Sequence, residues 1–176
     1  MQIRASCKID YDSIKALTHL SLFRKSDPKK RMLTGAIIYL FLAGILIRDM
    51  IIFSDLLYID LLLVVIAVLA LECFLYFLYP RIQYNAAANL KNVENVYLFC
   101  NDVLKISSKG DLYNGECEIG YSFFVKAFET SRYFFLFQTK RQVFVIDKNT
   151  IEGGTAADIR NQLASHIKGK YIICRY

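Results

Sequence analysis

The sequence predicts an α+β membrane protein, in which a two-helix transmembrane hairpin is joined to a small antiparallel β-barrel or bent sheet closed by a C-terminal amphipathic helix. The 176 residues are 55% hydrophobic, which is high for a soluble domain, yet 22% are charged, which is high for a wholly membrane-embedded chain. Two long apolar runs lie close together near the N-terminus, and short segments with strand-like patterns follow them. The chain therefore divides into residues 1–31, 32–79 and 80–176.

Residues 1–31 are expected to lie in the cytosol as a short strand followed by an amphipathic helix. The stretch 1–9 alternates loosely between apolar and polar residues, as a strand does. An Asp or Ser is available at residues 10–13 to cap the helix. The apolar stripe of this helix consists of Ile14, Leu17 and Leu20. Pro28 is expected to end the helix before the membrane.

Residues 32–79 are expected to form the hairpin, with spans at about 32–50 and 58–79. A bilayer core needs about 20 helical residues, and the first span reaches this length because its helix continues through Arg48, whose long side chain reaches the headgroups. A single helix through both runs would be ~70 Å long and would place four charged side chains in hydrocarbon, at about 2.5 kcal/mol or more each. A soluble core helix is also disfavoured, because LLLVVIAVLA has no polar stripe.

Positive charge before the hairpin sets its expected orientation. The first 31 residues contain eight Lys or Arg against three Asp, whereas the connector between the apolar runs contains one Arg and three Asp. Because Lys and Arg favour the cytoplasmic side, we expect both termini in the cytoplasm and the connector outside. Five of the basic residues are also candidate membrane-surface contacts for anionic lipid headgroups, worth about 1 kcal/mol each near the surface. They are Arg24, Lys25, Lys29, Lys30 and Arg31.

Glu72 is a candidate intramembrane polar site, because it is the one ionisable residue well inside a predicted span. It could serve in a proton or ion relay, or it could be a protonated or partly hydrated carboxyl that faces the partner helix. A relay needs further polar groups at similar depth, and the spans offer mainly Thr34 and Ser54 near their edges. This scarcity favours the second interpretation.

Residues 80–176 are expected to form a cytosolic β-rich domain. A first hairpin begins at Val96, where VYLFC, the turn residues ND and VLKISS follow one another. A bent strand or a strand pair with a kink at Gly120 comes next. The clearest hairpin joins RYFFLFQ to QVFVID, and its first strand is apolar on both faces, which indicates burial on both sides or one face against lipid or a partner. Glu129 is expected to be structural, either paired with Lys126 across a bend or accepting backbone hydrogen bonds.

A C-terminal helix is predicted at residues 155–168. Thr155 is placed to cap its N-terminus, and Asp158 occupies the third helical position, which makes a capping box with Asp instead of the usual Glu. One face of the helix carries Ile159, Leu163 and Ile167. Such a helix is suited to cover the open end or face of a curved sheet.

A further pattern lies in the strand region. Tyr121, Lys126, Glu129 and Thr130 belong to Y-x-x-x-x-K-x-x-E-T-x-x-Y-F-x-L-F, and V-I-D-K follows at 145–148 before a Gly-containing loop and a helix. With two adjacent spans before it, this layout resembles the YcxB-like family of bacterial membrane proteins. The resemblance implies a location in the bacterial cell membrane and a cytosolic domain similar to pleckstrin-homology-like domains, a bent barrel closed by a C-terminal helix. It brings no catalytic residues to this sequence.

The sequence shows no reactive constellation. The five cysteines are scattered and never form CxxC, and His19 and His166 lie in no metal-binding or catalytic motif. We therefore expect neither an enzyme nor a metal or other cofactor. The basic residues are dispersed among 16 acidic ones, which disfavours nucleic-acid binding. Several basic residues on predicted turns either form a solvated face or meet headgroups; they are Lys105, Lys109, Arg132, Lys140 and Arg141.

These observations lead to one main expectation of function and one alternative. In the first, a non-enzymatic integral membrane protein presents its cytosolic domain for binding lipid headgroups or a protein, including a second copy of the chain, at the inner face of the membrane. In the alternative, the chain is a membrane component of a transport or toxin-immunity system that acts through the hairpin. Glu72 separates the two, because only the second needs its carboxyl.

Overall fold

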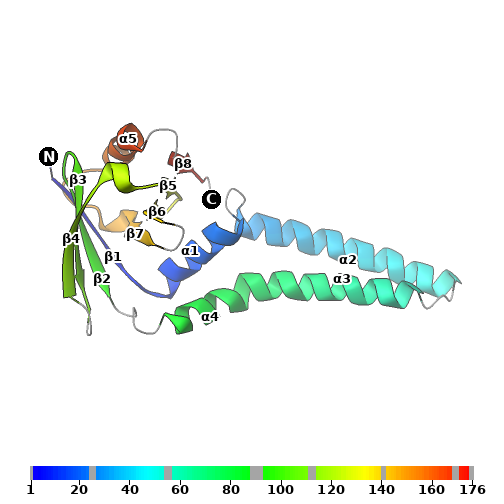
Figure 1. Ribbon diagram of the computed structural model, residues 1–176. Coiled ribbons are helices and arrows are strands. Elements are labelled where there is room, and N and C mark those ends of the chain that lie inside the picture. The colour runs from blue at the N-terminus through cyan, green and yellow to red at the C-terminus, as the bar shows by residue number, and fades with distance from the viewer. Residues whose placement is uncertain are drawn as a thin grey trace.

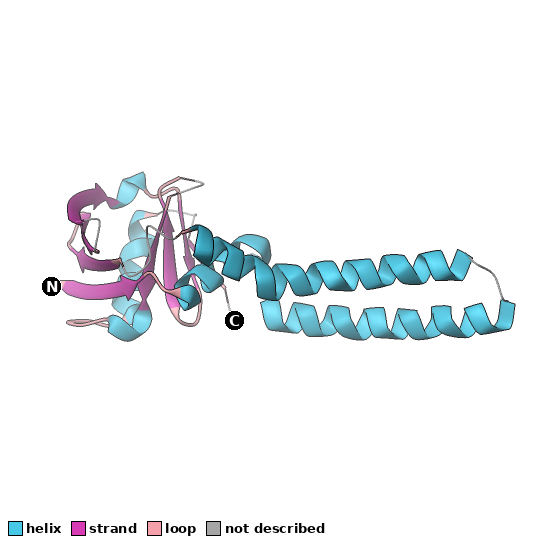
Figure 2. Cartoon of the chain, turned by 90° about the horizontal axis from the view of Figure 1, so that it is seen from below, coloured by secondary structure: helices cyan, strands magenta, loops and turns pink. Residues whose placement is uncertain are grey.

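The structure is a computed structural model that describes residues 2–23, 27–53, 57–87, 93–110, 114–139, 142–167 and 171–174. Its fold is α+β. Two long apolar helices run side by side away from a β-rich part that contains two sheets (Figure 1). Figure 2 shows the same arrangement from below, with the sheets gathered at one end of the hairpin. The predicted fold class is confirmed at this level.

The first sheet contains four antiparallel strands in the order β1-β2-β3-β4. They are β1 (Ile3–Lys8), β2 (Glu94–Phe99), β3 (Val103–Lys109) and β4 (Asn114–Gly120). β2 and β3 form the hairpin predicted from Val96. After β4 the chain enters a short 3₁₀ turn, η3 (Tyr121–Phe123), directly after Gly120, where the kink was predicted.

The second sheet has the order β7-β6-β5-β8. Its strands are β5 (Lys126–Glu129), β6 (Tyr133–Phe137), β7 (Val143–Asp147) and β8 (Tyr171–Ile173). β8 pairs with β5 in parallel, so the sheet is not wholly antiparallel. The sequence did not indicate β8, because a parallel strand of three residues carries no hairpin signal.

The two sheets meet at one seam, between β1 and the segment after β7. Arg4 and Glu152 exchange two backbone hydrogen bonds, of 2.9 and 2.8 Å. The Thr150 hydroxyl accepts from the Ser6 N–H at 2.8 Å and donates to the Ser6 carbonyl at 2.6 Å. The outer strands, β4 and β8, do not pair with each other in the part of the chain that is described. The sheets therefore bend around the core without closing into a barrel. Of the two predicted forms, a closed barrel and a bent sheet, the structure has the bent sheet.

Helix α5 (Ala156–His166) forms where the C-terminal helix was predicted. The predicted capping box is present, since the Thr155 hydroxyl accepts from the Asp158 N–H and the Asp158 carboxylate accepts from the Thr155 N–H at 2.8 Å. Residue 168, the predicted end, lies outside the described residues. The predicted apolar face is confirmed, because Ile159, Leu163 and Ile167 are all buried in the core.

The same helix connects the two sheets. The Gln162 side-chain amide donates to the carbonyl oxygen of Cys100, which follows β2, and to the Tyr121 hydroxyl at 3.1 Å. Tyr121 donates in turn to the Cys100 carbonyl at 2.9 Å. Arg160, two residues before Gln162, binds Glu129 on β5. α5 thus bonds to the first sheet and to the second sheet at once.

The core lies between the sheets and is rich in aromatic side chains. All five residues of β6 are buried, and the middle three have no exposed surface. Of the two interpretations of this doubly apolar strand, burial on both sides is the one that the structure supports. β6 is a central strand of its sheet, so the other strands and α5 cover it. Burial of a large apolar side chain stabilises a fold by about 1.5–3 kcal/mol.

The whole helical region is inserted between two neighbouring strands. β1 pairs with β2 along its full length, from Ile3 opposite Phe99 to Lys8 opposite Glu94. Between them come α1 (Tyr11–Phe23), α2 (Pro28–Phe53), α3 (Leu57–Cys73), the π-helical turn η1 (Phe74–Leu78) and α4 (Tyr79–Ala86). The β1–β2 pairing therefore joins the predicted segments 1–31 and 80–176 in one sheet.

Pro28 begins a helix and does not end one, contrary to the prediction. A proline is tolerated in the first turn because its missing N–H would have no partner there. Asp27 precedes it and caps the helix: its carboxylate accepts from the N–H of Lys29 at 2.9 Å, and its carbonyl accepts from the N–H of Arg31 at 2.9 Å. α1 had already ended at Phe23.

The two long helices extend beyond the predicted spans, over residues 28–53 and 57–86. They are long and apolar enough to cross a membrane by length and composition. In the most apolar part of each, only 6% and 11% of the residues are buried inside the protein, so their apolar side chains are not those of a core helix. Arg48 and Asp49, near the far end of α2, form a 2.6 Å ion pair. Residues 54–56 of the predicted connector lie outside the described residues.

One buried carboxylate joins four elements of the second sheet and its surroundings. Glu129 on β5 is 2% exposed and receives the Lys148 ammonium at 2.6 Å, the Arg160 guanidinium at 2.6 and 2.7 Å, and the Tyr171 hydroxyl at 2.5 Å. The expected partner, Lys126, instead lies over the Phe137 ring at 4.8 Å. Burial alone raises the pKa of Glu129, but the hydrogen bonds from these three partners outweigh it and lower the pKa to about 2.

Glu129→Gln should therefore destabilise the protein by about 3 kcal/mol, because it removes a buried carboxylate and leaves two cations, Lys148 and Arg160, without their counter-charge. In the native protein the contribution of this group is present above its ordinary pKa of 4.5 and is lost as the pH falls toward about 2. In the variant, the free energy of unfolding should lack this part of its dependence on pH. Urea unfolding of the full chain in detergent micelles, followed by near-ultraviolet circular dichroism at several pH values, measures both effects.

Glu118→Gln is the matched control for this change. Glu118 also loses an ion pair, with Lys105 at 2.6 Å, but both side chains are about half exposed. An exposed pair contributes about 0–1 kcal/mol. Equal losses in the two variants would show that Glu129 does not hold the fold together.

Candidate functional site

Three of the five predicted membrane-surface contacts lie within the described residues, at the root of the hairpin where the sheets meet the long helices. Lys29, Lys30 and Arg31 occupy the first turn of α2 and are exposed. Arg31 places its guanidinium 5.5 Å from the centre of the Phe23 ring at the end of α1. Arg24 and Lys25 lie outside the described residues. The described members of the cluster are thus all within one helical turn of the apolar stretch.

A cavity of about 380 Å³ opens at this root, between α1, the start of α2 and the turn from β5 to β6. Its size falls in the range of small-ligand sites. Three cationic side chains line it together with one carboxylate and three aromatic side chains. These residues are Lys15, Lys29, Arg132, Asp27, His19, Tyr76 and Tyr133. The sequence placed Arg132 on a turn but gave no indication that Lys15 and Lys29 would face it.

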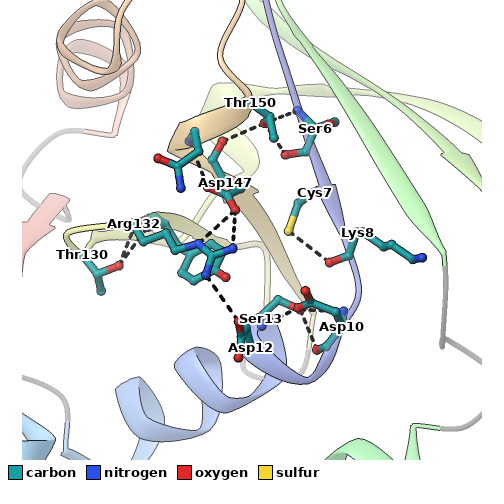
Figure 3. A network of polar contacts seen from close by, with 12 residues as sticks. Ser6, Cys7, Lys8, Asp10, Asp12, Ser13, Thr130, Arg132, Asp147 and Thr150 are labelled. Atoms are coloured by element: carbon teal, nitrogen blue, oxygen red, sulfur yellow. Dashed lines mark hydrogen bonds and ion pairs between the residues drawn. The ribbon is translucent and has the colours of Figure 1, made fainter.

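The β5–β6 turn holds Arg132 in this position. The Thr130 hydroxyl accepts from the N–H of Tyr133 at 3.1 Å, and the N–H of Thr130 donates to the carbonyl of Tyr133 at 2.9 Å. Arg132 then donates to the Asp147 carboxylate at 3.1 Å and to Asp12 at 3.5 Å (Figure 3). One arginine from the turn therefore connects β7 to α1 at the edge of the cavity.

The N-terminus of α1 is fixed by its own polar contacts, also visible in Figure 3. The Asp10 carboxylate accepts from the N–H of Ser13 at 2.8 Å, and the Ser13 hydroxyl accepts from the N–H of Asp10 at 3.0 Å. This is the cap predicted at residues 10–13. Cys7, just before it, is buried, and burial raises the pKa of its thiol to about 12, so this thiol is unreactive at neutral pH.

The C-terminal half of α1 is bonded to the second long helix. The ring nitrogen Nε2 of His19 lies 3.2 Å from the carbonyl oxygen of Tyr76 and donates to it, and the two rings stack at 4.7 Å. The cause lies in the sequence: Pro80 follows Tyr76 by four residues and has no N–H, so the regular helical bond to this carbonyl cannot form. The chain adopts the π-helical turn η1 at this point, and His19 supplies the missing donor.

His19 is held as a neutral side chain. It is 7% exposed, and burial lowers its pKa below the ordinary 6.5. Its neutral ring leaves the cationic residues of the cavity, Lys15, Lys29 and Arg132, as the sources of positive charge. The sequence assigned no role to His19, although the Pro80 spacing was a signal that Tyr76 would need an outside donor.

Glu72 lies between the two long helices and faces the partner helix. Its Oε2 is buried and has no hydrogen-bond partner among the described residues. Gly35 on α2 makes room for it, because a Cβ at that position would lie 2.7 Å from this oxygen. A separate cavity of about 430 Å³ beside it is lined by Thr34 and by Lys30 and Arg31 at the helix start. These polar groups lie between Glu72 and the domain end of α2.

No described group of three or more His, Cys, Asp and Glu side chains is arranged to hold a metal ion. The second histidine, His166 on α5, is exposed and bonds to the carbonyl of Gln162 at 2.8 Å. Compared with known proteins, the chain matches no protein-family model, no curated protein and no solved structure. Among the described residues, the cationic cavity at the root of the hairpin is the candidate functional site.

The role of His19 can be tested with Pro80, because the two residues act on the same carbonyl. His19→Phe keeps a stacked ring but leaves the Tyr76 carbonyl without a donor, and we expect this to loosen α1 by about 1–3 kcal/mol. Pro80→Ala restores an N–H four residues after Tyr76. In the double variant the loss should therefore be smaller. Hydrogen–deuterium exchange of residues 11–23 in the micelle-bound protein measures the difference.

His166→Phe serves as the control, since it replaces an exposed histidine that makes no contact with the hairpin helices among the described residues. It should leave the exchange of residues 11–23 unchanged. If His19→Phe and the double variant lose the same protection from exchange in residues 11–23, then His19 does not stabilise α1 through its hydrogen bond to the Tyr76 carbonyl.

Proposed function

We propose that this chain is a non-enzymatic integral membrane protein whose cytosolic, pleckstrin-homology-like domain binds lipid headgroups at the inner face of the membrane. The observation that carries the proposal is the position of the cationic cavity. It lies at the first turn of α2, directly where the apolar stretch of the hairpin begins. Cations held at this depth meet headgroups, and each contributes about 1 kcal/mol to attraction by an anionic leaflet.

The order of the elements supports the pleckstrin-homology-like part of the proposal. Four antiparallel strands are followed by three more in a second sheet, and a capped helix then bridges the two sheets. This is the layout that the resemblance to the YcxB-like family leads one to expect. The hairpin occupies the connection between the first two strands. If the hairpin spans the membrane, this connection keeps the ligand-binding domain close to the membrane surface.

Charge supports a cytosolic position for the domain. Lys29, Lys30 and Arg31 stand at the domain end of α2, whereas Arg48 near the far end is paired with Asp49. Positively charged helix ends favour the cytoplasmic side. A protein partner at the same face is the competing occupant, and photo-crosslinking from residue 15 in native membranes separates the two: a phospholipid adduct supports the proposal, and a protein adduct contradicts it.

Orientation is tested by labelling thiols with a membrane-impermeant maleimide. We expect the thiol introduced by Ser54→Cys to react in right-side-out vesicles, because it lies in the connector. Cys117, which is exposed on β4, should react only in inverted vesicles. Peptide mapping by mass spectrometry assigns each label to its cysteine.

The buried Cys7 is an internal control for this experiment, since a folded domain keeps it unlabelled on either side. The reversed pattern, with Cys117 reacting from the outside, would place the domain outside the cell and exclude the proposed function.

Glu72 favours one alternative, a transport or toxin-immunity component that acts through the hairpin. The observation behind it is the buried and unpartnered Oε2 against Gly35. An intramembrane carboxyl of this kind is often functional. The headgroup-binding proposal predicts that Glu72→Gln changes neither membrane insertion nor headgroup association, because a neutral amide of the same size fits beside Gly35.

The measurement is the proton permeability of liposomes that contain the purified chain. If the native protein conducts protons and Glu72→Gln abolishes conduction, the alternative is correct. Asp49→Asn is the matched control, because it removes a carboxylate from the other end of the hairpin, where Asp49 is paired with Arg48. It should have no effect on permeability in either case.

A further inference from the structure

We infer that the cavity at the root of the hairpin holds a phosphate group, carried by an anionic phospholipid of the surrounding leaflet. This inference rests on the proposed function for its orientation, but it assigns the binding to one place and one chemistry. The assignment depends on three properties of the cavity: its surplus of positive charge, its free donors and its depth relative to the membrane.

Positive charge exceeds negative charge among the residues that line the cavity, although Arg132 is also paired with Asp147 and Asp12 outside the lining. Lys15, Lys29 and Arg132 line it, whereas its described lining contains one carboxylate, Asp27. That carboxylate is already engaged, since its Oδ1 accepts from the backbone N–H groups of Lys29 and Lys30 at 2.9 and 3.4 Å. Cations that share a partly enclosed space repel one another, and an anion between them removes this repulsion.

Two of the cations have donors to spare. Neither Lys15 nor Lys29 forms a salt bridge with any residue that the structure describes. Three other cations in the domain have carboxylate partners: Lys148 and Arg160 bind Glu129, and Arg132 binds Asp147. Since Arg132 keeps its carboxylate partner, the two lysines are the groups that an incoming phosphate would neutralise.

The cavity begins at the depth of the headgroups. Its lining includes Pro28 and Lys29, the first residues of α2, and Tyr76 in the second long helix. Its other wall is the turn around Ser131, which belongs to the domain. A phosphate bound between these walls is within reach of a phospholipid whose acyl chains lie along the hairpin. A volume of about 380 Å³ accommodates a phosphate with part of its headgroup.

A binding measurement on the full chain tests this inference. The protein is reconstituted in phosphatidylcholine, and the fraction of motionally restricted spin-labelled phosphatidylglycerol is compared with that of spin-labelled phosphatidylcholine. We expect the native protein to select phosphatidylglycerol. The double variant Lys15→Gln, Lys29→Gln should lower this selectivity by about fivefold for each cation removed. Neither lysine takes part in a salt bridge among the described residues, so the variant is expected to fold.

Lys8→Gln, Arg81→Gln is the matched control. It removes the same net charge, and Arg81 is exposed on α4, beyond the π-helical turn that contains Tyr76, but does not line the cavity. Selectivity should stay near the native value. Equal losses in the two double variants would show a diffuse attraction to the basic surface. That result would overturn the cavity as the binding site while leaving the proposed membrane-surface function intact.

A second arm separates lipid phosphate from free phosphate. Glycerol 3-phosphate is titrated into the native protein in phosphatidylcholine nanodiscs by calorimetry. The lipid source predicts no binding and no displacement of phosphatidylglycerol. Binding that depends on Lys15 and Lys29 would keep the phosphate chemistry but move its source to a soluble ester. Absence of any selectivity in a correctly oriented native protein would overturn the inference, whereas the labelling pattern and the crosslink from residue 15 test the proposed function.

Discussion

The pairing of β1 with β2 constrains the whole molecule, because these neighbouring strands are separated in the sequence by the entire helical region. Six residues of each strand are in register, so the chain must leave the sheet and return to the point from which it left. An antiparallel pair of helices satisfies this requirement, whereas one crossing does not. If the hairpin enters a membrane, both of its ends therefore lie on the same side. The sheet thus requires that the two ends share one side, and charge predicts that this side is the cytoplasmic one.

The distribution of charge within the domain distinguishes the root of the hairpin from its surroundings. Lys148 and Arg160 share Glu129, and Arg132 binds Asp147, so these three cations have carboxylate partners. Lys15 and Lys29 take part in no ion pair among the described residues. Both line a cavity beside the start of the long helices. Under the proposed function, an anionic headgroup supplies the counter-charge there that carboxylates supply elsewhere in the domain.

Local patterns were sufficient to predict much of the fold. The length of the apolar runs predicted the two long helices, and the spacing of Thr155 and Asp158 predicted the cap of α5. The apolar residues on both faces of β6 indicated a strand buried on both sides. These features depend on residues within about one turn or one strand of each other. Pro28 was misjudged because a proline both ends and begins helices, and the deciding neighbour was the capping Asp27.

Contacts between distant residues were beyond the sequence patterns. Glu129 was expected to meet Lys126, three residues away, yet its partners come from 19, 31 and 42 residues further on. The cationic cavity has the same character, since Lys15 and Arg132 become neighbours only once α1 packs beside the β5–β6 turn. The apolar and polar pattern within a single strand or helix does not predict contacts between residues so far apart in the sequence. Only the parallel addition of β8 and the packing of α5 bring the partners of Glu129 together.

The Tyr76 carbonyl connects a local sequence pattern to a contact between residues that are distant in the sequence. Pro80 removes the N–H that this carbonyl would bind, and an unpaired carbonyl at the edge of a membrane costs several kcal/mol. The second helix must therefore find a donor outside itself, and His19 on α1 is that donor. α1 in turn bears Lys15 and borders the cationic cavity. A proline in the second long helix is thus coupled, through His19 on α1, to the wall of the cationic cavity in the domain.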